Sequence, residues 1–369
     1  MKINKVLISL FIVILSRSIT AKIIPKYPID ESFWIKENNP LVFNLLTSRP
    51  ELTIDHVKAN GFELYGPKGL ESFLKRNSIE YRPLLKIRKN LQSGYPSPLE
   101  IEKNLKEIAQ KYPDITKLYS IGKSVKNRDL WVMKLSRNAK ADDNRPEFKY
   151  IANMHGDEIC GREILVRFIK ECTESYGVDP ILTTLLDKYQ IHILVSMNPD
   201  GAATATRSNA NRVDLNRDFP DFSTSDNKDT PKNRQPETQA VMKWQDQHKF
   251  ILSANFHGGS EVVNYPWDTI PNRFPQDSLV KDLSLEYAKN APYIAASTYF
   301  ENGITNGFNW YEVNGGMQDW SIYWRKDFQI TIELSNEKWP AYSSIDYYYE
   351  QNRPALIKLI ERIESIPKK

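Results

Sequence analysis

Short apolar runs alternate with amphipathic segments along most of this 369-residue chain. The runs are typical of buried strands, and apolar residues between Ile164 and Ile169 recur at the spacing of a helix. The strand candidates are residues 148–154, 191–196, 251–256 and 328–334. Strands separated by helices predict an α/β fold, with a mixed, mostly parallel central sheet and helices on both faces. In such a fold the chemistry gathers at strand ends.

Residues 22–94 follow a different pattern. Between residues 62 and 74 the sequence predicts a strand, a turn at Gly66-Pro67 and a helix, which indicates a small α+β N-terminal segment. A basic stretch then runs from Lys86 to Lys89.

The boundary with the main domain is expected near residue 94. A linker with Gly, Pro and Ser covers residues 93–98. Ser97 and Glu100, with Pro98 between them, have the spacing of a helix capping box. The main domain would therefore cover residues 95–369.

The first residues are typical of a secretory signal. Lys2 and Lys5 form a positive start, and the apolar run from Val6 to Leu15 is too short to span a bilayer comfortably. Cleavage after Ala21 would make residues 1–21 a signal peptide, and an uncleaved N-terminal anchor is the alternative. We expect a secreted or periplasmic protein without stable membrane insertion.

The composition is that of an ordinary soluble protein, with 40% hydrophobic residues, 26% charged residues and a formal net charge of +4. No Lys/Arg block indicates nucleic-acid binding, so no nucleic-acid partner is expected. Cys160 and Cys172 are the two cysteines. Their positions in one expected helix are roughly 18 Å apart. That separation is too large for a disulfide, so we expect two buried thiols.

A candidate metal site begins with the His-x-x-Glu pattern of His155 and Glu158. The histidine is expected to end a strand and the glutamate to open a helix, so both side chains can converge across a tight turn. Catalytic zinc takes three protein ligands and leaves a fourth position open, and His257, before two glycines, can supply the third. The remaining histidines are interpreted as structural, with His192 packed in a strand and His56 and His248 solvated.

Four segments, in order, resemble those of a known enzyme family. Residues 253–268 resemble the second zinc segment of the zinc metallocarboxypeptidases, in particular of their carboxypeptidase N/E/D branch. Residues 207–221 resemble the substrate-anchoring segment of that branch, and residues 311–319 and 331–334 resemble its third and fourth blocks. The resemblance covers roughly residues 95 to 365.

The resemblance implies a site that holds one Zn²⁺ ion. His155, Glu158 and His257 would be its ligands, and Asp214 would orient His155. Glu333 would be the general base, which takes a proton from zinc-bound water and returns it to the leaving amine.

The resemblance also implies how a substrate is held. Arg217, with Asn216, would bind the terminal carboxylate, because a guanidinium matches a carboxylate with two hydrogen bonds. Arg207 would stabilise the oxyanion that develops on the scissile carbonyl, and Tyr311 would close over the bound end.

Asp268 bears on specificity. In the resembling branch, an acidic residue eleven positions after the second zinc histidine lies in the pocket for the terminal side chain, and Gln318 also matches that branch. A carboxylate there would pair with Lys or Arg, so we predict a preference for C-terminal basic residues. The alternative is that Asp268 caps a turn.

Two positions differ from the usual sequence of the branch, and one N-terminal segment is additional to it. Asp218 replaces the usual Asn and could weaken anion capture by Arg217 if it points inward, and Arg212 stands where Gly is usual. Residues 22–94 loosely resemble the prosegment of the digestive-type carboxypeptidases. The stretch from Lys86 to Lys89 would suit a trypsin-like protease, so we hypothesise an inhibitory, removable prosegment.

The sequence therefore predicts a monomeric zinc carboxypeptidase that acts on the C-termini of peptides or proteins. Two alternatives stay open. One is an amidohydrolase or peptidase of the same fold that acts on cell-wall peptides, and the other is a non-catalytic peptide-binding relative.

Overall fold

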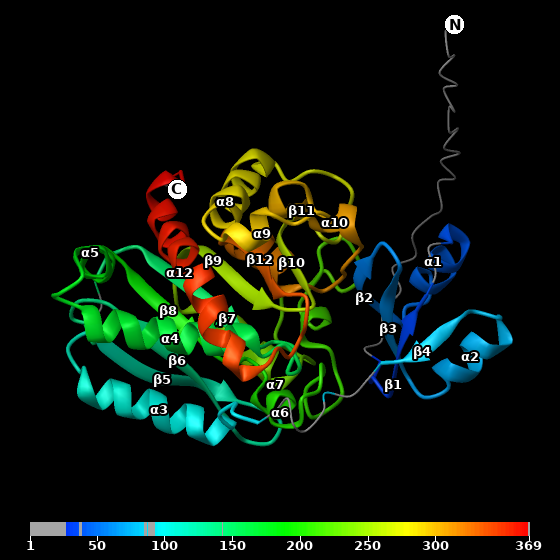
Figure 1. Cartoon of the computed structure of the whole chain (residues 1–369), viewed down its shortest axis with the longest axis horizontal. Coiled ribbons are helices and arrows are strands. Elements are labelled where there is room, and N and C mark those ends of the chain that lie inside the picture. Colours follow the sequence, from blue (N-terminus) through cyan, green and yellow to red (C-terminus); the bar gives the residue numbers. More distant parts are fainter. Residues whose placement is uncertain (1–26, 37–38, 85–86, 88–92, 142, 368–369) are drawn as a thin grey trace, which may run out of the picture.

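The computed structural model describes residues 27–36, 39–84, 87, 93–141 and 143–367. The expected signal peptide at 1–21, and all of the stretch from Lys86 to Lys89 except Ile87, lie outside these ranges. The described chain forms a large α/β domain and a smaller N-terminal domain beside it (Figure 1).

An eight-stranded sheet lies at the centre of the large domain. Its strands are β5 (Thr116–Lys123), β6 (Asp129–Leu135), β7 (Glu147–Ala152), β8 (Gln190–Leu194), β9 (Phe250–His257), β10 (Ser260–Tyr265), β11 (Ile304–Asn306) and β12 (Phe328–Ser335). They lie in the order β11-β10-β12-β9-β7-β8-β6-β5. The inner strands β12, β9, β7 and β8 are parallel, whereas antiparallel pairing occurs toward both edges. The mixed sheet that the sequence predicts is confirmed.

Helices cover both faces of this sheet (Figure 1). One face carries α3 (Pro98–Lys111), α4 (Cys160–Ser175), α5 (Pro180–Lys188), α8 (Asp277–Lys289) and α12 (Ile345–Glu361). The other carries α7 (Pro236–Asp246) and α11 (Met317–Trp320). The short helices α6 (Pro199–Thr204), α9 (Pro292–Ala295) and α10 (Gly307–Trp310) lie in the connections. Within the described residues, no helix is both long and apolar enough to cross a membrane.

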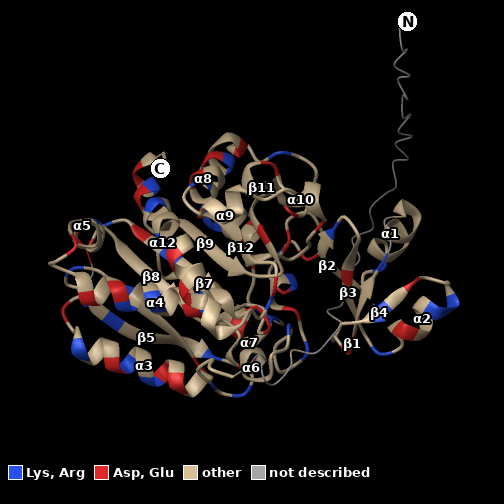
Figure 2. Ribbon diagram, viewed as in Figure 1, with Lys and Arg blue, Asp and Glu red and all other residues tan. Residues whose placement is uncertain are grey.

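Helix α3 begins where the sequence predicts. The Ser97 hydroxyl accepts the backbone N–H of Glu100 (3.3 Å), and the Glu100 carboxylate accepts the N–H of Ser97 (2.7 Å). Ile101, Leu105 and Ile108 are buried against the sheet, whereas Lys and Glu occupy the outer face (Figure 2).

Helix α4 buries the apolar residues from Ile164 to Ile169, as their spacing predicts. Cys160 and Cys172 also lie on α4, both buried and both free thiols. The expectation of two unpaired structural cysteines is confirmed.

The N-terminal domain has its own sheet and its own core. Its strands are β1 (Glu31–Ile35), β2 (Thr53–Lys58), β3 (Gly61–Gly66) and β4 (Tyr81–Pro83), in the antiparallel order β2-β3-β1-β4. Helices α1 (Pro40–Thr47) and α2 (Leu70–Arg76) pack against it. The sequence of β3 followed by α2 matches the strand, turn and helix expected between residues 62 and 74.

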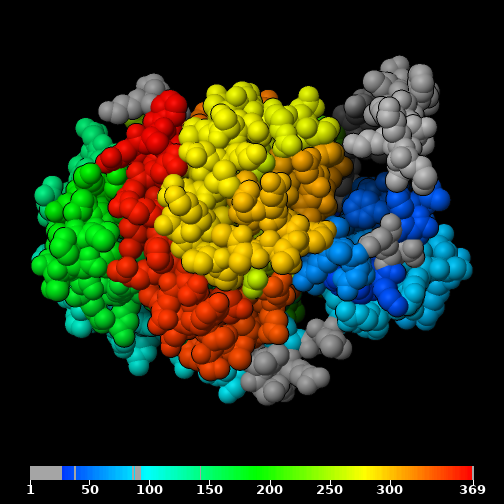
Figure 3. Space-filling model, turned by 45° about the horizontal axis from the view of Figure 1, so that its top comes forward, coloured from blue at the N-terminus to red at the C-terminus, as the bar shows by residue number. Residues whose placement is uncertain are grey.

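The register of the parallel strands brings three functional segments to one edge of the large sheet. Glu333 on β12 lies beside His257 on β9, and Ala152 at the end of β7 lies beside Phe256. The carboxyl ends of these strands therefore meet, as they do at ligand sites of open α/β sheets. The N-terminal domain, blue in Figure 3, packs against the large domain on the side where β2 lies.

Candidate metal centre and substrate site

A short loop between β7 and α4 carries the first two candidate ligands. Strand β7 ends at Ala152 and α4 begins at Cys160, so His155 and Glu158 both lie in the loop rather than at the element ends that the sequence suggested. Asn153 starts the loop with a positive φ of 56°, and its side-chain amide donates to the carbonyl of His155 (2.9 Å). This hydrogen bond folds the loop back on itself.

The loop is packed tightly against its neighbour. A Cβ atom on Gly156 would lie 2.1 Å from the backbone carbon of Gly201, so only glycine fits there. The N–H of Gly156 also donates to the carbonyl of Arg207 (3.2 Å). The position of His155 and Glu158 is therefore fixed by backbone contacts as well as by their own side chains.

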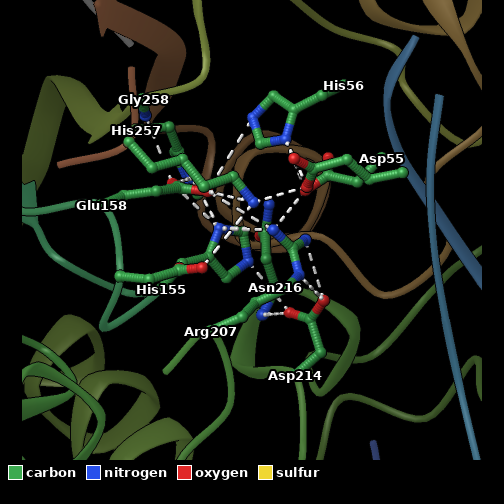
Figure 4. Close-up of polar contacts among 12 residues, drawn as sticks. Asp55, His56, His155, Glu158, Arg207, Asp214, Asn216, His257 and Gly258 are labelled. Carbon is green, nitrogen blue, oxygen red and sulfur yellow. Dashed lines mark hydrogen bonds and ion pairs between the residues drawn. The ribbon is translucent and has the colours of Figure 1, made fainter. Parts of the chain in front are cut away.

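Three buried donor atoms converge at this loop (Figure 4). His155 Nδ1 and Glu158 Oε2 are 3.0 Å apart, and His257 Nδ1 lies 2.8 Å from the same carboxylate oxygen. The two imidazole Nδ1 atoms are 3.1 Å apart. The predicted ligands His155, Glu158 and His257 therefore come together from the β7–α4 loop and from β9.

This donor set fits zinc. Tetrahedral coordination with bonds of about 2 Å separates its ligand atoms by roughly 3.3 Å. The separations between the donor atoms of His155, Glu158 and His257 are 2.8–3.1 Å. Two imidazole nitrogens and one carboxylate oxygen also form a typical catalytic zinc set with room for one more ligand.

Asp214 lies behind the first histidine. Its carboxylate accepts a hydrogen bond from His155 Nε2 (3.1 Å), which leaves Nδ1 directed toward Glu158. The same carboxylate accepts the Nε–H of Arg207 (3.0 Å). Burial opposes ionisation, but Arg207 and His155 outweigh it and hold the pKa of Asp214 well below its usual range. A charged partner of this kind fixes the tautomer and the direction of a ligand histidine.

Glu333 is the carboxylate expected to act as base. It lies near the end of β12, is only 4% exposed, and its Oε2 atom has no hydrogen-bond partner within the described part of the chain. Burying a carboxylate without hydrogen bonds is costly, so its place beside the three ligands indicates a chemical role.

The substrate-binding candidates surround the same centre. Asn216 follows Asp214 in a short 3₁₀ turn, and its side-chain oxygen accepts the N–H of Met317 (2.9 Å). Arg217 is partly exposed and donates from Nη2 to the carbonyl of Ile54 in the N-terminal domain (3.2 Å). The structure thus places the guanidinium beside the site, but its N–H groups donate to backbone carbonyls of this chain.

Tyr311 and Arg207 also contact the N-terminal domain. The Tyr311 hydroxyl donates to Asp55 Oδ1 (2.6 Å), and the Arg207 guanidinium forms an ion pair with the same carboxylate. Burial raises the pKa of the Tyr311 phenol, which keeps the group a hydrogen-bond donor. Asp55 therefore accepts from two side chains that the sequence assigned to substrate.

Asp268 lies in a buried polar cluster. Its Oδ1 atom accepts from the Asn264 amide (2.7 Å), while Oδ2 has no hydrogen-bond partner among the described residues. Its backbone N–H donates to Asp319 (2.9 Å). Burial raises the pKa of Asp268 to about 6, although hydrogen bonds from Asn264 and Gln318 act in the opposite direction. Gln318 on α11 thus lies beside Asp268.

His56 lies beside the candidate metal centre, a placement that the sequence interpretation missed. It was expected to be solvated, and this is wrong, because the side chain is buried and its Nε2 atom lies 3.9 Å from both Glu158 Oε1 and Glu333 Oε2 (Figure 4). A single histidine in a strand-forming segment has no local pattern that indicates a site. Only the packing of β2 against the large domain brings it to Glu158.

The other two histidines lie at the opposite end of the sheet. His192 is buried within β8, as expected, and His248 is partly exposed. Glu147 lies 2.6 Å from His248 Nδ1 and accepts the N–H of Lys249, so it has a structural role at the start of β7.

Comparison with known proteins agrees with this geometry. The family model for zinc carboxypeptidases matches residues 101–355, which is most of the large domain. This chain belongs to the zinc carboxypeptidase family. The metal that the family's description names is the one that the three donors fit.

Curated relatives of the family match the same region. The chain is 43% identical to carboxypeptidase D of Anas platyrhynchos over 72% of its own length and 20% of that protein. It is 40% identical to carboxypeptidase M of Mus musculus over 76% of its length and 68% of that protein. The chain thus spans about a fifth of the length of the carboxypeptidase D relatives that it matches.

Solved structures share the fold at low identity. Thrombin activatable fibrinolysis inhibitor is 18% identical with a TM-score of 0.69, and the match covers 92% of this chain and 99% of that one. Carboxypeptidase A from Helicoverpa armigera is 16% identical with a TM-score of 0.71, covering 91% and 98%. Coverage of that extent includes the N-terminal domain as well as the large domain.

Both departures from the carboxypeptidase pattern now have a structural account. The Asp218 carboxylate accepts the backbone N–H of Gln235 (2.7 Å), so it is held by the segment that precedes α7. Arg212 adopts a positive φ of 64°, which is the conformation that a glycine favours. Its side chain pairs with Asp30 and its carbonyl accepts the N–H of Ile29 (2.8 Å), so it contacts the N-terminal domain.

Proposed function

We propose that this chain is a zinc carboxypeptidase that hydrolyses the C-terminal bond of peptides or proteins and prefers C-terminal Lys or Arg. The observation that carries the proposal is the set of three converging ligand atoms beside Glu333, a buried carboxylate whose Oε2 atom has no hydrogen-bond partner among the described residues. A zinc-binding structural site would not require that additional carboxylate.

Each side chain has a task in this reaction. Bound zinc would supply a Lewis acid that polarises a carbonyl and lowers the pKa of water. Glu333 would accept a proton from the attacking water and return it to the leaving amine. Arg207, already held by Asp214, would donate to the oxyanion. Arg217 would bind the terminal carboxylate, which restricts cleavage to chain ends.

The preference for Lys or Arg rests on Asp268. Its buried carboxylate keeps one oxygen without a hydrogen-bond partner among the described residues, and a cationic side chain would satisfy it. A Cβ atom on Gly307 would lie 2.2 Å from the Asp268 carboxyl carbon, so this glycine gives the carboxylate its space.

A comparison of three peptides that end in Arg, Phe and Glu tests this function. The large domain, freed from residues 22–94, should cleave the Arg peptide fastest, and a zinc chelator should abolish the activity. Cleavage that resists the chelator would refute zinc catalysis. Faster cleavage of the Phe peptide would refute only the role of Asp268, and cleavage inside a peptide would refute the role of Arg217.

We also propose that residues 22–94 are an inhibitory prosegment of a secreted, monomeric enzyme. The contacts of the N-terminal domain support this, because Asp55 engages Arg207 and Tyr311 while the carbonyl of Ile54 engages Arg217. These are the side chains that a substrate would need. Release would require a cut in the linker that precedes α3.

A further inference from the structure

We propose that His56 is a fourth protein ligand of the zinc ion in the uncleaved chain, so that the N-terminal domain closes the coordination position that catalysis needs open. This inference rests on the proposed zinc-dependent function. It adds a way in which the N-terminal domain keeps the uncleaved enzyme inactive. It assigns a metal ligand outside the large domain.

The position of the imidazole is the first observation. Its Nε2 atom lies 3.9 Å from Glu158 Oε1 and 3.9 Å from Glu333 Oε2. Asp55, His56 and Glu158 form a group whose potential ligand atoms lie within 4.8 Å of one another, and Glu158 belongs equally to the group with His155 and His257. The two groups share the Glu158 carboxylate through different oxygens, because Oε1 faces His56 whereas Oε2 faces His155 and His257.

The orientation of the ring is the second observation. His56 Nδ1 faces two carboxylate oxygens, Glu63 Oε2 at 3.1 Å and Asp55 Oδ2 at 3.2 Å. Lys338 in turn holds Glu63, with 2.6 Å between Nζ and Oε2. A carboxylate on one ring nitrogen is the usual partner of a metal-binding histidine, because it directs the other nitrogen toward the metal. The structure gives His56 this arrangement with Nε2 toward Glu158.

The space for the ring is the third observation. A Cβ atom on Gly259 would lie 2.3 Å from His56 Nε2. The imidazole therefore occupies space that any side chain at position 259 would fill. Gly259 follows the ligand His257 by two residues. The same glycine thus lets the imidazole approach the segment that carries the third zinc ligand.

The backbone of β2 is the fourth observation. His56 has a positive φ of 46°, and the pairing of β2 with β3 shifts register between Asp55 and Lys58. An irregularity of this kind redirects a side chain, and a positive φ is unfavourable for a residue other than glycine. Surrounding contacts must stabilise this backbone, and they aim His56 at the large domain.

Neighbouring contacts hold this segment at both ends. The carbonyl of Ile54 accepts from Arg217 (3.2 Å), and the carbonyl of Val57 accepts the Trp310 indole N–H (2.8 Å). His56 lies between these two anchors. Its position is therefore fixed by backbone hydrogen bonds that do not involve the imidazole.

Cobalt substitution of the full chain tests the assignment. The metal-free protein is reloaded with one equivalent of Co²⁺, and its visible spectrum is recorded with and without azide, for the native chain, His56→Ala, His56→Gln and Asp30→Asn. Asp30→Asn is the matched control, because it removes a contact of the N-terminal domain with Arg212 that lies apart from the ligands. The cleaved large domain serves as the reference for an open site.

We expect azide to leave the spectra of the native chain and of Asp30→Asn unchanged, and to shift those of both His56 variants and of the cleaved domain. Loss of even an outer partner of a metal site costs about 10- to 100-fold in affinity, so zinc release to 1,10-phenanthroline should be at least about tenfold faster in His56→Ala. Both His56 variants should retain the far-ultraviolet circular dichroism of the native chain.

Two results would overturn the assignment. One is an azide shift in the native chain equal to that in His56→Ala, and the other is an equal rate of zinc release from both. A cleaved domain that binds Co²⁺ but has no peptidase activity would instead refute the proposed function, and the differences among the uncleaved variants would still be measurable.

Discussion

Glu333 is the residue that distinguishes the proposed catalytic site from a purely structural metal site. The carboxylate lies beside His257 across the β9–β12 pair and takes no part in the convergence of the three ligand atoms. It is buried, although charge is costly to bury without partners. The exposed surface could accommodate such a glutamate at no cost, so its place at the strand end indicates a chemical role.

Glu333→Gln should therefore abolish most of the activity and leave the metal in place. General-base assistance contributes about 10²- to 10⁴-fold, so kcat/KM of the cleaved domain should fall by that factor, while its zinc content stays the same. Steady-state kinetics and metal analysis of the same sample measure both. Glu350→Gln, the same change at an exposed position of α12, is the matched control and should leave kcat/KM unaffected. Retained activity in Glu333→Gln would exclude it as the base.

If Asp268 binds the terminal basic side chain, as proposed, specificity depends on pH. Burial raises its pKa to about 6, so the group is charged above that pH and neutral below it. The ratio of kcat/KM for Arg over Phe peptides should therefore fall as pH decreases below 6, by up to about tenfold per pH unit. In Asp268→Asn the ratio should be low and independent of pH. A ratio in the native domain that does not vary between pH 5 and 8 would contradict this role.

At the scale of elements, local signals account for the start of α3. The capping box of Ser97 and Glu100 satisfies backbone N–H groups that the helix itself leaves free. Burial of Ile101, Leu105 and Ile108 then fixes which face meets the sheet.

Ser97→Ala should weaken the large domain slightly without affecting its chemistry. Loss of an N-cap costs about 1 kcal/mol, which lowers Tm by about 2 °C in a domain of this size. Thermal unfolding of the cleaved domain measures the change. Ser175→Ala, at the last residue of α4 rather than at an N-cap, should leave Tm almost unaffected. Equal shifts in the two variants would argue against the cap.

At the scale of the whole molecule, the N-terminal domain covers the site of the large domain. Its contacts extend from the pair of Asp30 with Arg212, through Asp55 with Arg207, to Glu63 with Lys338. Each pair joins opposite charges, and the second and third lie in largely buried surroundings. The N-terminal domain also has its own hydrophobic core. We therefore expect it to fold as a separate unit that binds firmly over the site.

Removal of residues 22–94 should increase activity. A state disfavoured by a few kcal/mol is populated at roughly 0.1–10%, so kcat/KM should rise on the order of 10- to 1000-fold when the domain is cut away and separated. Kinetics on the full and the shortened chain, both loaded with zinc, measure the increase. Equal activity of the two forms would refute the prosegment.

Much of the large domain could be predicted from sequence alone. Apolar periodicity is a local property, so strands β7, β8, β9 and β12, helix α4 and the capping box of α3 could be predicted from neighbouring residues, whereas β10 and β11 were not. His155 and Glu158 lie three residues apart, so one short loop suffices to join them. His257, before two glycines, could be proposed as the third ligand, and the family resemblance then supplied Glu333, which the parallel register of β9 and β12 brings beside it.

Tertiary structure alone decided what covers that site. Nothing near His56 or Asp55 indicates a role, because their partners lie in the large domain and reach them only when the two domains pack. The direction of Asp218 and the positive φ of Arg212 were also beyond the sequence, since each depends on a distant contact. Local patterns determine elements and short motifs, whereas contacts between segments far apart in the chain determine which side chains share a buried site.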